Sequence, residues 1–259
     1  MLPLLAITLA AMLCAFFLLW FVSLRLRDAS IVDVFWGPGF AIIAVTAFLL
    51  TGGATPRRAL VTSLALIWGA RLGIHLFLRN RGTGEDYRYQ AMRRRHGTRF
   101  GLVSLVTVFG FQALLLWFIS LPLQVAQVSP VPARLTALDG LGLLLWMAGF
   151  LFEAVGDRQL ERFKADPANR GRVMDRGLWA WTRHPNYFGD ALLWWGFFVI
   201  ACATPRGAWT FASPLMMTFL LMRVSGVPLL EQRLARTRPG YADYVRRTGV
   251  FLPRPPKRG

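Results

Sequence analysis

The chain of 259 residues is 55% hydrophobic and only 17% charged, and 30 Lys and Arg against 13 Asp and Glu give a formal charge of +17. A soluble domain carries about a quarter charged residues, whereas here the apolar residues gather in runs of roughly 17–21, long enough to cross a bilayer. This excludes an ordinary soluble enzyme, a disordered chain, a collagen and a coiled coil. It predicts an all-α, polytopic membrane protein whose positive charge faces a lipid bilayer, with no nucleic acid as partner.

Seven apolar segments are predicted to span the membrane. The first has no Lys or Arg before it and Arg25 and Arg27 directly after it, the reverse of a signal peptide, so we expect it to remain as an anchor. No internal repeat is found, and residues 1–259 are predicted to form a single integral membrane domain. In chain order the predicted spans are Leu4–Leu24, Val32–Leu50, Leu60–Leu78, Leu102–Leu121, Leu138–Val155, Tyr187–Ala203 and the short Phe211–Val224.

The positive residues predict the orientation of these spans. The links after spans one, three and five, together with the tail, hold 24 of the 30 Lys and Arg. Because positive loops stay in the cytoplasm, we expect the N-terminus outside and the C-terminus inside, as in a bacterial inner membrane protein. Residues 79–100 and 157–186 are then cytoplasmic loops. The tail, 226–259, is also cytoplasmic and is predicted to form helices at Pro228–Leu234 and Tyr241–Arg247.

Ionisable side chains at membrane depth are rare and commonly functional, and several here recur every four residues on one helix face. The candidates are the single Asp33 and three groups spaced by four residues: Arg71, His75 and Arg79; Glu153, Asp157 and Glu161; and Asp190 with the polar Asn186. Structural alternatives remain open for each. Asp33 can cap a helix, the arginines can snorkel, His75 can be a satisfied buried histidine, and the acids can form a solvated face. Cys14 and Cys202 make no disulfide framework, and no metal ligand set is predicted.

The stretch Gly177–Asp190 carries the densest polar chemistry. It places Arg, His, Asn, Tyr and Asp at the start of the sixth span, where free backbone N–H groups and the helix dipole favour phosphate or carboxylate. Cationic residues upstream are suited to the phosphates of a dinucleotide; these are Arg162, Lys164, Arg170, Arg172 and Arg176. The alternative is a positive loop that only faces lipid.

This stretch, with Phe152–Asp157 upstream, resembles the C-terminal domain of the steroid 5α-reductase family. Asp28–Gly37 and Arg79–Gln90 resemble the bacterial branch of that family, so the resemblance covers nearly the whole chain. A similar Arg-His-Pro-x-Tyr entry and a Glu…Tyr…Tyr tail occur in the isoprenylcysteine and phospholipid methyltransferases, which share the architecture and use S-adenosylmethionine. A membrane methyltransferase is therefore the alternative function. The many cations of the 157–186 link favour the more anionic NADPH.

The resemblance implies a seven-span fold that binds NADPH from the cytoplasmic side and reduces the Δ4 double bond of a 3-oxosteroid to a 5α product. The absence of a Rossmann fingerprint agrees with this family. Residues that match cofactor positions of the family, or belong to the same motif and loop, are Asp157, Arg162, Lys164, Asn169, Arg172, Arg183, His184, Asn186, Tyr187, Asp190, Arg223 and Glu231.

The substrate side departs from the family pattern. The eukaryotic enzymes polarise the C3 carbonyl with a Gln-Glu pair on the second span and a Tyr on the third, where this chain has Phe35-Trp36 and Leu76. We expect hydride to reach the β-carbon of a steroid or another enone lipid while an acid hydrogen-bonds the carbonyl. The candidate catalytic residues are Asp33, His75, Glu85 and Tyr87, and Trp36 and Asp33 are expected to contact substrate. No obligate protein partner is indicated. A channel, receptor or scaffold without catalytic activity is a further alternative.

Overall fold

The computed structural model describes residues 1–224 and 226–256. The protein is 79% helical, and no strand forms among the described residues, which confirms the all-α prediction. The chain divides into two compact units, each described by itself. Unit 1 comprises Met1–Thr136 and Ala201–Thr210, and unit 2 comprises Ala137–Ile200 and Phe211–Gly259.

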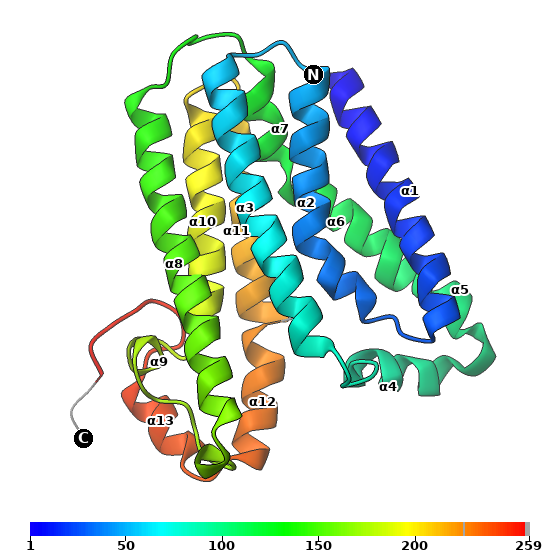
Figure 1. Ribbon diagram of the computed structural model, residues 1–259, viewed down its shortest axis with the longest axis vertical. Helices are drawn as coiled ribbons and strands as arrows, with labels where there is room; N and C mark the ends of the chain where they lie inside the picture. The colour runs from blue at the N-terminus through cyan, green and yellow to red at the C-terminus, as the bar shows by residue number, and fades with distance from the viewer. Residues whose placement is uncertain (225, 257–259) are drawn as a thin grey trace. The chain divides into compact units, whose positions relative to one another are not determined.

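Unit 1 is organised around the pair α2 and α3, which lie side by side (Figure 1). The two helices approach closely because Gly37 and Gly69 face each other, and a Cβ on either would collide with the carbonyl of the other. α1 packs on α2 and α6. The long helices of this unit are α1 (Leu2–Leu26), α2 (Ile31–Leu50) and α3 (Thr55–Asn80).

The predicted fourth span of unit 1 is built from several helical pieces. α4 (Tyr87–His96) and a 3-10 turn precede α5 (Phe100–Ser104), the π-helix η2 (Leu105–Gly110) and α6 (Phe111–Ile119). Pro122 then starts α7 (Leu121–Val128), because proline fits the first turn of a helix but not its interior. The buried amide of Gln124 accepts a hydrogen bond from Thr8 on α1 at 2.7 Å, so polar contacts hold α7 inside the bundle.

Unit 2 is built on α8 (Ala137–Ala165) and α10 (Pro185–Cys202). Glycines spaced by seven residues line their contact; they are Gly142, Gly149 and Gly156 on α8 and Gly189 and Gly196 on α10. A Cβ added at Gly149 would lie 2.5 Å from the carbonyl oxygen of Gly189. The missing side chains therefore let the two backbones touch, which fixes the start of α10 against α8.

The rest of unit 2 consists of shorter helices. They are η3 (Pro167–Asn169), α9 (Leu178–Trp181), α11 (Ala212–Phe219), the π-helix η5 (Leu220–Val224), α12 (Val227–Thr237) and α13 (Tyr241–Arg247). The predicted tail helices are confirmed, and the first is longer than predicted. α8 also continues to Ala165, eight residues beyond Asp157, because no glycine or proline interrupts it before Pro167.

The structure supports an integral membrane protein. Five helical segments are long and apolar enough to cross a bilayer: α1, α2, α3, Tyr87–Ile119 and α8. The shorter apolar segment Ala208–Val224 and the 18-residue α10 lie at the predicted seventh and sixth spans. α1 leaves large apolar side chains exposed, among them Phe17 at 51% and Leu18 at 65%. Such a surface is suited to hydrocarbon rather than water.

Candidate functional site

Asp33 lies in the first turn of α2 and is the centre of a polar cluster in unit 1. Its carboxylate accepts hydrogen bonds from Arg88 Nη2 at 2.6 Å and from the Tyr89 hydroxyl at 2.8 Å. Asp86 caps α4 by accepting from the Arg88 backbone amide, and its own amide donates to Ser30 Oγ at 2.6 Å. These bonds dock α4 on the start of α2, so Asp33 does more than cap its own helix.

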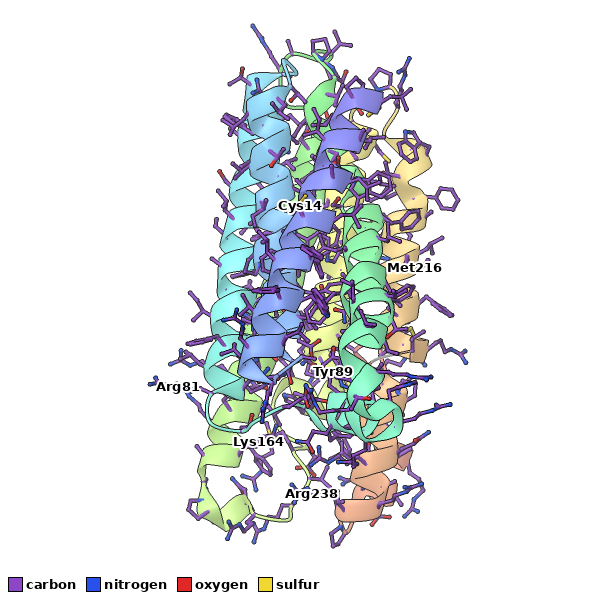
Figure 2. All side chains as sticks on the ribbon, turned by 90° about the vertical axis from the view of Figure 1, so that its right-hand side faces the viewer. Cys14, Arg81, Tyr89, Lys164, Met216 and Arg238 are labelled. Atoms are coloured by element: carbon purple, nitrogen blue, oxygen red, sulfur yellow. The ribbon has the colours of Figure 1, made fainter. Side chains whose placement is uncertain are left out.

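The cluster continues from Tyr89 toward the apolar part of the bundle. Gln112 on α6 donates to the Tyr89 hydroxyl at 3.4 Å and accepts from Trp36 Nε1 at 2.5 Å. We call Asp33, Trp36, Arg88, Tyr89 and Gln112 the Asp33 cluster. It brings together the two residues expected to contact substrate, Asp33 and Trp36. Figure 2 shows Tyr89 and Arg81 toward the same end of the unit 1 helices, with Cys14 farther along α1.

The other candidate catalytic residues of unit 1 take different positions. Glu85 accepts from the Ala29 amide at 2.9 Å and from Arg93 Nη2 at 2.7 Å. Burial by itself raises the pKa of Glu85, but the hydrogen bonds from Arg93 and Ala29 hold that pKa below its ordinary value. The ionised carboxylate of Glu85 therefore links Arg93 of α4 to the backbone at Ala29. Tyr87 is 46% exposed and His75 is partly exposed, and the hydrogen bonds of the Asp33 cluster run through other residues.

Sequence reasoning missed Arg88, Tyr89 and Gln112. Tyr87 and Tyr89 both belong to α4. Residues that are two positions apart in a helix point about 200° apart around its axis. Only one of the two tyrosines can thus face α2, and the structure places Tyr89 there. In the sequence, Arg88 and Tyr89 could have been selected because they follow the capping residue Asp86 at the start of a helix. Nothing in the sequence around Gln112 indicates that it belongs to the cluster.

At the start of α10, unit 2 holds a pair of polar side chains, the half-buried Asn186 and the buried Asp157. Asn186 Nδ2 donates to Asp157 Oδ1 of α8 at 3.1 Å, and Asp157 is 7% exposed. The other polar atom of the Asn186 side chain, Oδ1, is buried and has no hydrogen-bond partner among the described residues. A buried acceptor without a donor is costly in the folded protein. The α8–α10 contact through Gly156 and Pro185 brings these residues together.

A second group in unit 2 joins the start of α10 to α12. Glu231 accepts from Arg183 Nε at 2.8 Å and lies 3.1 Å from His184 Nε2. Arg183 also donates to the Thr248 carbonyl at 2.9 Å. The ring of Tyr187 stacks on His184, with centroids 5.4 Å apart and planes 8° from parallel. We call Arg183, His184 and Glu231 the Glu231 clamp, which fixes the Arg-His pair of the motif.

Electrostatics support an ionised Glu231. Burial by itself raises the pKa of Glu231, but hydrogen bonds from His184 and Arg183 and the positive charge of Arg183 hold it below its ordinary value. Burial, followed by the negative charge of Glu231, raises the pKa of Tyr241 to about 12. The clamp therefore combines the Glu231 carboxylate with the guanidinium of Arg183.

The remaining residues expected at the cofactor surround these groups within unit 2. Asp190 is partly buried one turn after Asn186, and Asn169 is held by the Phe163 carbonyl at 3.1 Å. Exposed cations lie on the end of α8, the following loop and η5; they are Arg162, Lys164, Arg172 and Arg223. All residues expected to hold the cofactor thus belong to unit 2, and all those expected at the substrate belong to unit 1.

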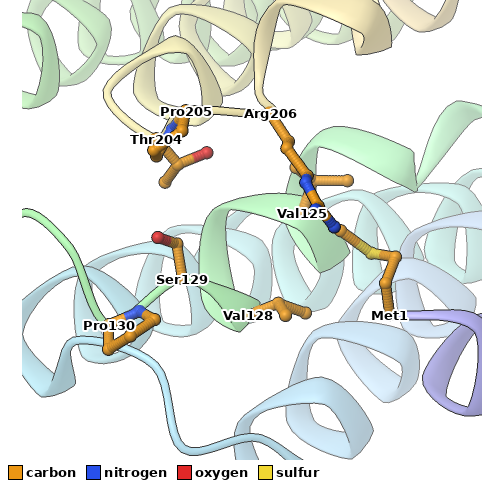
Figure 3. A pocket seen from close by; sticks show the side chains of 8 residues that line it. All are labelled: Met1, Val125, Val128, Ser129, Pro130, Thr204, Pro205 and Arg206. Carbon is orange, nitrogen blue, oxygen red and sulfur yellow. The ribbon is translucent and has the colours of Figure 1, made fainter.

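Two hollows of unit 1 lie apart from the hydrogen bonds of the Asp33 cluster. A cavity of about 230 Å³ is lined by residues of α7 and of two loops, including Ser129, Thr204 and Arg206 (Figure 3). An apolar groove of about 620 Å³ lies between α1 and the η2–α6 segment, with Phe16, Phe109 and Ala113 among its lining residues. Within the described residues, no group of three or more His, Cys, Asp and Glu is arranged to hold a metal ion.

The fold and these clusters define a helical membrane protein with buried polar sites at helix starts. The chain belongs to the DUF1295 family of proteins of unknown function, which it matches over residues 19–248. This range contains the Asp33 cluster and the Glu231 clamp. The chain is also similar to an uncharacterized protein of Schizosaccharomyces pombe, with 27% identity over 264 residues that cover 91% of this chain and 76% of the yeast protein. No solved structure matches the chain significantly.

Proposed function

We propose that this protein is an NADPH-dependent membrane reductase that acts on the Δ4 double bond of 3-oxosteroids or of a similar enone lipid. The observation that carries the proposal is the buried, unsatisfied Oδ1 of Asn186 beside Asp157 at the start of α10. An amide or ribose hydroxyl of a dinucleotide can donate to this oxygen and remove its cost. The residues of the resemblance to the steroid 5α-reductases include this same asparagine.

The remaining residues of unit 2 fit the other parts of such a cofactor. Asp157 and Asp190 are suited to accept from sugar hydroxyls or an amide, and the exposed cations Arg162, Lys164 and Arg172 are suited to phosphates. In this proposal the Glu231 clamp positions Arg183 and His184, because it already uses most of the donors of Arg183. When bound, NADPH supplies the hydride for the β-carbon of the enone.

The Asp33 cluster contains groups of the kind that the carbonyl end of the reaction needs. The Tyr89 O–H, once it turns from Asp33, and the second N–H of Gln112 can both donate to an oxygen on which negative charge develops. Asp33, which accepts from both Arg88 and Tyr89, is suited to orient these donors. We assign proton donation to Tyr89, a residue that sequence reasoning did not select, and a positioning role to Asp33. The aromatic ring of Trp36, bonded to Gln112, suits contact with an apolar lipid body.

We further infer seven spans, with the N-terminus outside and the cofactor residues facing the cytoplasm. Beyond the five long apolar segments, α10 and the shorter segment Ala208–Val224 supply two more of suitable composition. The links that hold 24 of the 30 Lys and Arg then all lie on one side. In this proposed topology of a bacterial inner membrane protein, the residues that would hold NADPH face the cytoplasm, where NADPH is available.

The proposal is tested with detergent-solubilised protein, NADPH and progesterone, by following NADPH oxidation and the mass of the steroid product. We expect a gain of two hydrogens with the wild type. Asn186→Ala should lower NADPH affinity and abolish turnover, because it removes the hydrogen bond to Asp157 and the oxygen proposed to accept from the cofactor. Asn80→Ala, at the end of α3 in unit 1, is the matched control and should keep both properties. Binding of S-adenosylmethionine in place of NADPH, with no steroid reduction, would contradict the proposal and favour the methyltransferase.

A further inference from the structure

The positive charge of unit 1 is concentrated where α4 leads into a membrane-spanning segment. The residues Arg93, Arg94, Arg95 and Arg99 lie directly before the apolar stretch that starts at Phe100. The ends of two other helices of unit 1 add exposed cations: Arg27 follows α1, and Arg81 follows α3. These residues lie in the same unit as the Asp33 cluster, and the proposed reductase activity makes no use of Arg94, Arg95 or Arg99.

The arginines of this segment fall into two classes. Arg88 is bonded to Asp33 and Asp86, and Arg93 is bonded to Glu85 while its guanidinium lies 4.4 Å above the ring of Phe100. These contacts join α4 to Asp33 of α2 and to Phe100 of α5. Asp33, Asp86 and Glu85 are therefore each bound to an arginine of α4.

The second class consists of Arg94, Arg95 and Arg99, which we call the free arginines. All three are exposed, and none of their side chains has a hydrogen bond or ion pair with a described residue. Arg94 and Arg95 lie on α4, which is anchored by its other arginines, and Arg99 ends the 3-10 turn Gly97–Arg99 that follows. All three lie within eight residues of the apolar Leu102, which is 71% exposed. A solvated loop would not combine a fixed backbone, uncompensated charge and an adjoining lipid-facing surface.

We propose that the free arginines form a binding site for the phosphate headgroup of anionic phospholipids. A guanidinium donates two parallel hydrogen bonds to phosphate oxygens, and a cation at the surface of an anionic membrane is attracted strongly to it. Because the helix is held in place, less conformational entropy is lost when a headgroup binds. The exposed apolar side chains after Phe100 offer a surface for the acyl chains of the same lipid.

The test is lipid retention by the full chain. The protein is reconstituted into nanodiscs of phosphatidylcholine and phosphatidylglycerol in equal amounts, released into detergent, and its bound lipids are counted by native mass spectrometry. We expect the wild type to retain phosphatidylglycerol in preference to phosphatidylcholine. The triple variant R94Q/R95Q/R99Q should lose this preference by at least about fivefold. The variant R94K/R95K/R99K keeps the charge and should retain part of the preference, which separates loss of the site from failure to fold.

The control is R236Q/R238Q/R254Q, which removes the same charge from exposed or partly exposed positions of unit 2. It should retain phosphatidylglycerol like the wild type. An equal loss in both glutamine triples would show that only net charge matters and would overturn the proposal, as would no loss in either. Soluble glycerol phosphate at millimolar concentration should not displace the lipid; complete displacement would assign the arginines to a soluble phosphate compound instead.

Discussion

At the scale of single residues, the neighbours of Asp33 decide what the cluster can do. A carboxylate that accepts from both Arg88 and Tyr89 has no proton of its own to give when it is ionised. The Tyr89 hydroxyl donates its one hydrogen to Asp33 and accepts from Gln112, so the phenol oxygen is held in place and the O–H must turn from Asp33 to donate to a substrate oxygen. A donor whose oxygen is already positioned needs less reorganisation when negative charge develops on the substrate. The chemistry at this end of the protein therefore depends on Tyr89.

We expect Tyr89→Phe to lower the turnover number for enone reduction by about 100-fold, the lower range for removal of a general acid, while NADPH affinity stays unchanged. The substitution removes one hydroxyl and keeps the ring. Tyr87→Phe is the matched control, two residues away on the same helix, and should keep activity within about twofold. Steady-state kinetics and NADPH binding measured on the same samples check this. Comparable losses in both variants would argue against the assignment.

At the scale of elements, short contacts of two kinds position the polar residues of unit 2. The glycines of α8 and α10 bring Asp157 and Asn186 within hydrogen-bond distance. The tail returns to α9 and the start of α10, where the Tyr244 hydroxyl donates to the Trp179 carbonyl at 2.6 Å and the Arg183 amide donates to the Gly249 carbonyl at 2.9 Å. The Glu231 clamp adds α12 to this arrangement. Three elements distant in sequence thus fix the Arg-His pair.

The clamp predicts a pH dependence of stability. Because the pKa of Glu231 is lower in the folded protein than in the unfolded chain, its ionised form stabilises the fold above the unfolded pKa of about 4.3. That contribution is lost as the pH falls through the lower, folded pKa. We expect Glu231→Gln to cost about 1–2 kcal/mol at pH 7 and to cost less at pH 4. Thermal unfolding in detergent at the two pH values measures the difference.

The control for this pH dependence is Asp243→Asn. Asp243 pairs with Arg246 on the surface of α13, where the side chains are 59% and 73% exposed. An exposed pair contributes about 0–1 kcal/mol, so this variant should change the unfolding temperature little at either pH. If Glu231→Gln changed the unfolding temperature equally little at both pH values, the clamp would not stabilise the fold.

At the scale of the whole molecule, charge and hydropathy act together. A chain with a formal charge of +17 and five long apolar helices must place its cations beside the membrane, since burying them in hydrocarbon is costly. The positive residues occupy alternate links between the apolar segments. This alternation is typical of a protein whose positive loops all remain in the cytoplasm.

Single cysteines test this orientation. With Cys14 and Cys202 replaced by serine, we expect Gly52→Cys, between α2 and α3, to react with a membrane-impermeant maleimide in intact cells. Thr83→Cys, between α3 and α4, should react only after the cells are opened. Both positions are exposed, so access to reagent depends on the side of the membrane. The reverse pattern would invert the orientation, and labelling of both in intact cells would contradict the span between them.

The sequence by itself determined the helical membrane class, the tail helices and the polar stretch at the start of α10. These follow from local properties, namely apolar run length, helix-breaking residues and charge along the chain. The resemblance to a family added the expected cofactor residues, because its motif around Asn186 is contiguous in sequence.

Only the tertiary structure decided which side chains meet. Asp33 is joined by Tyr89 instead of the neighbouring Tyr87, Gln112 links it to Trp36, and Glu231 crosses 48 residues of chain to reach Arg183. Such contacts depend on the rotation and depth of each helix. The rotation and depth of a helix are set by its packing, for example at the glycines of α8 and α10. The pattern of residues along one helix does not reveal which of its faces the partner helix covers.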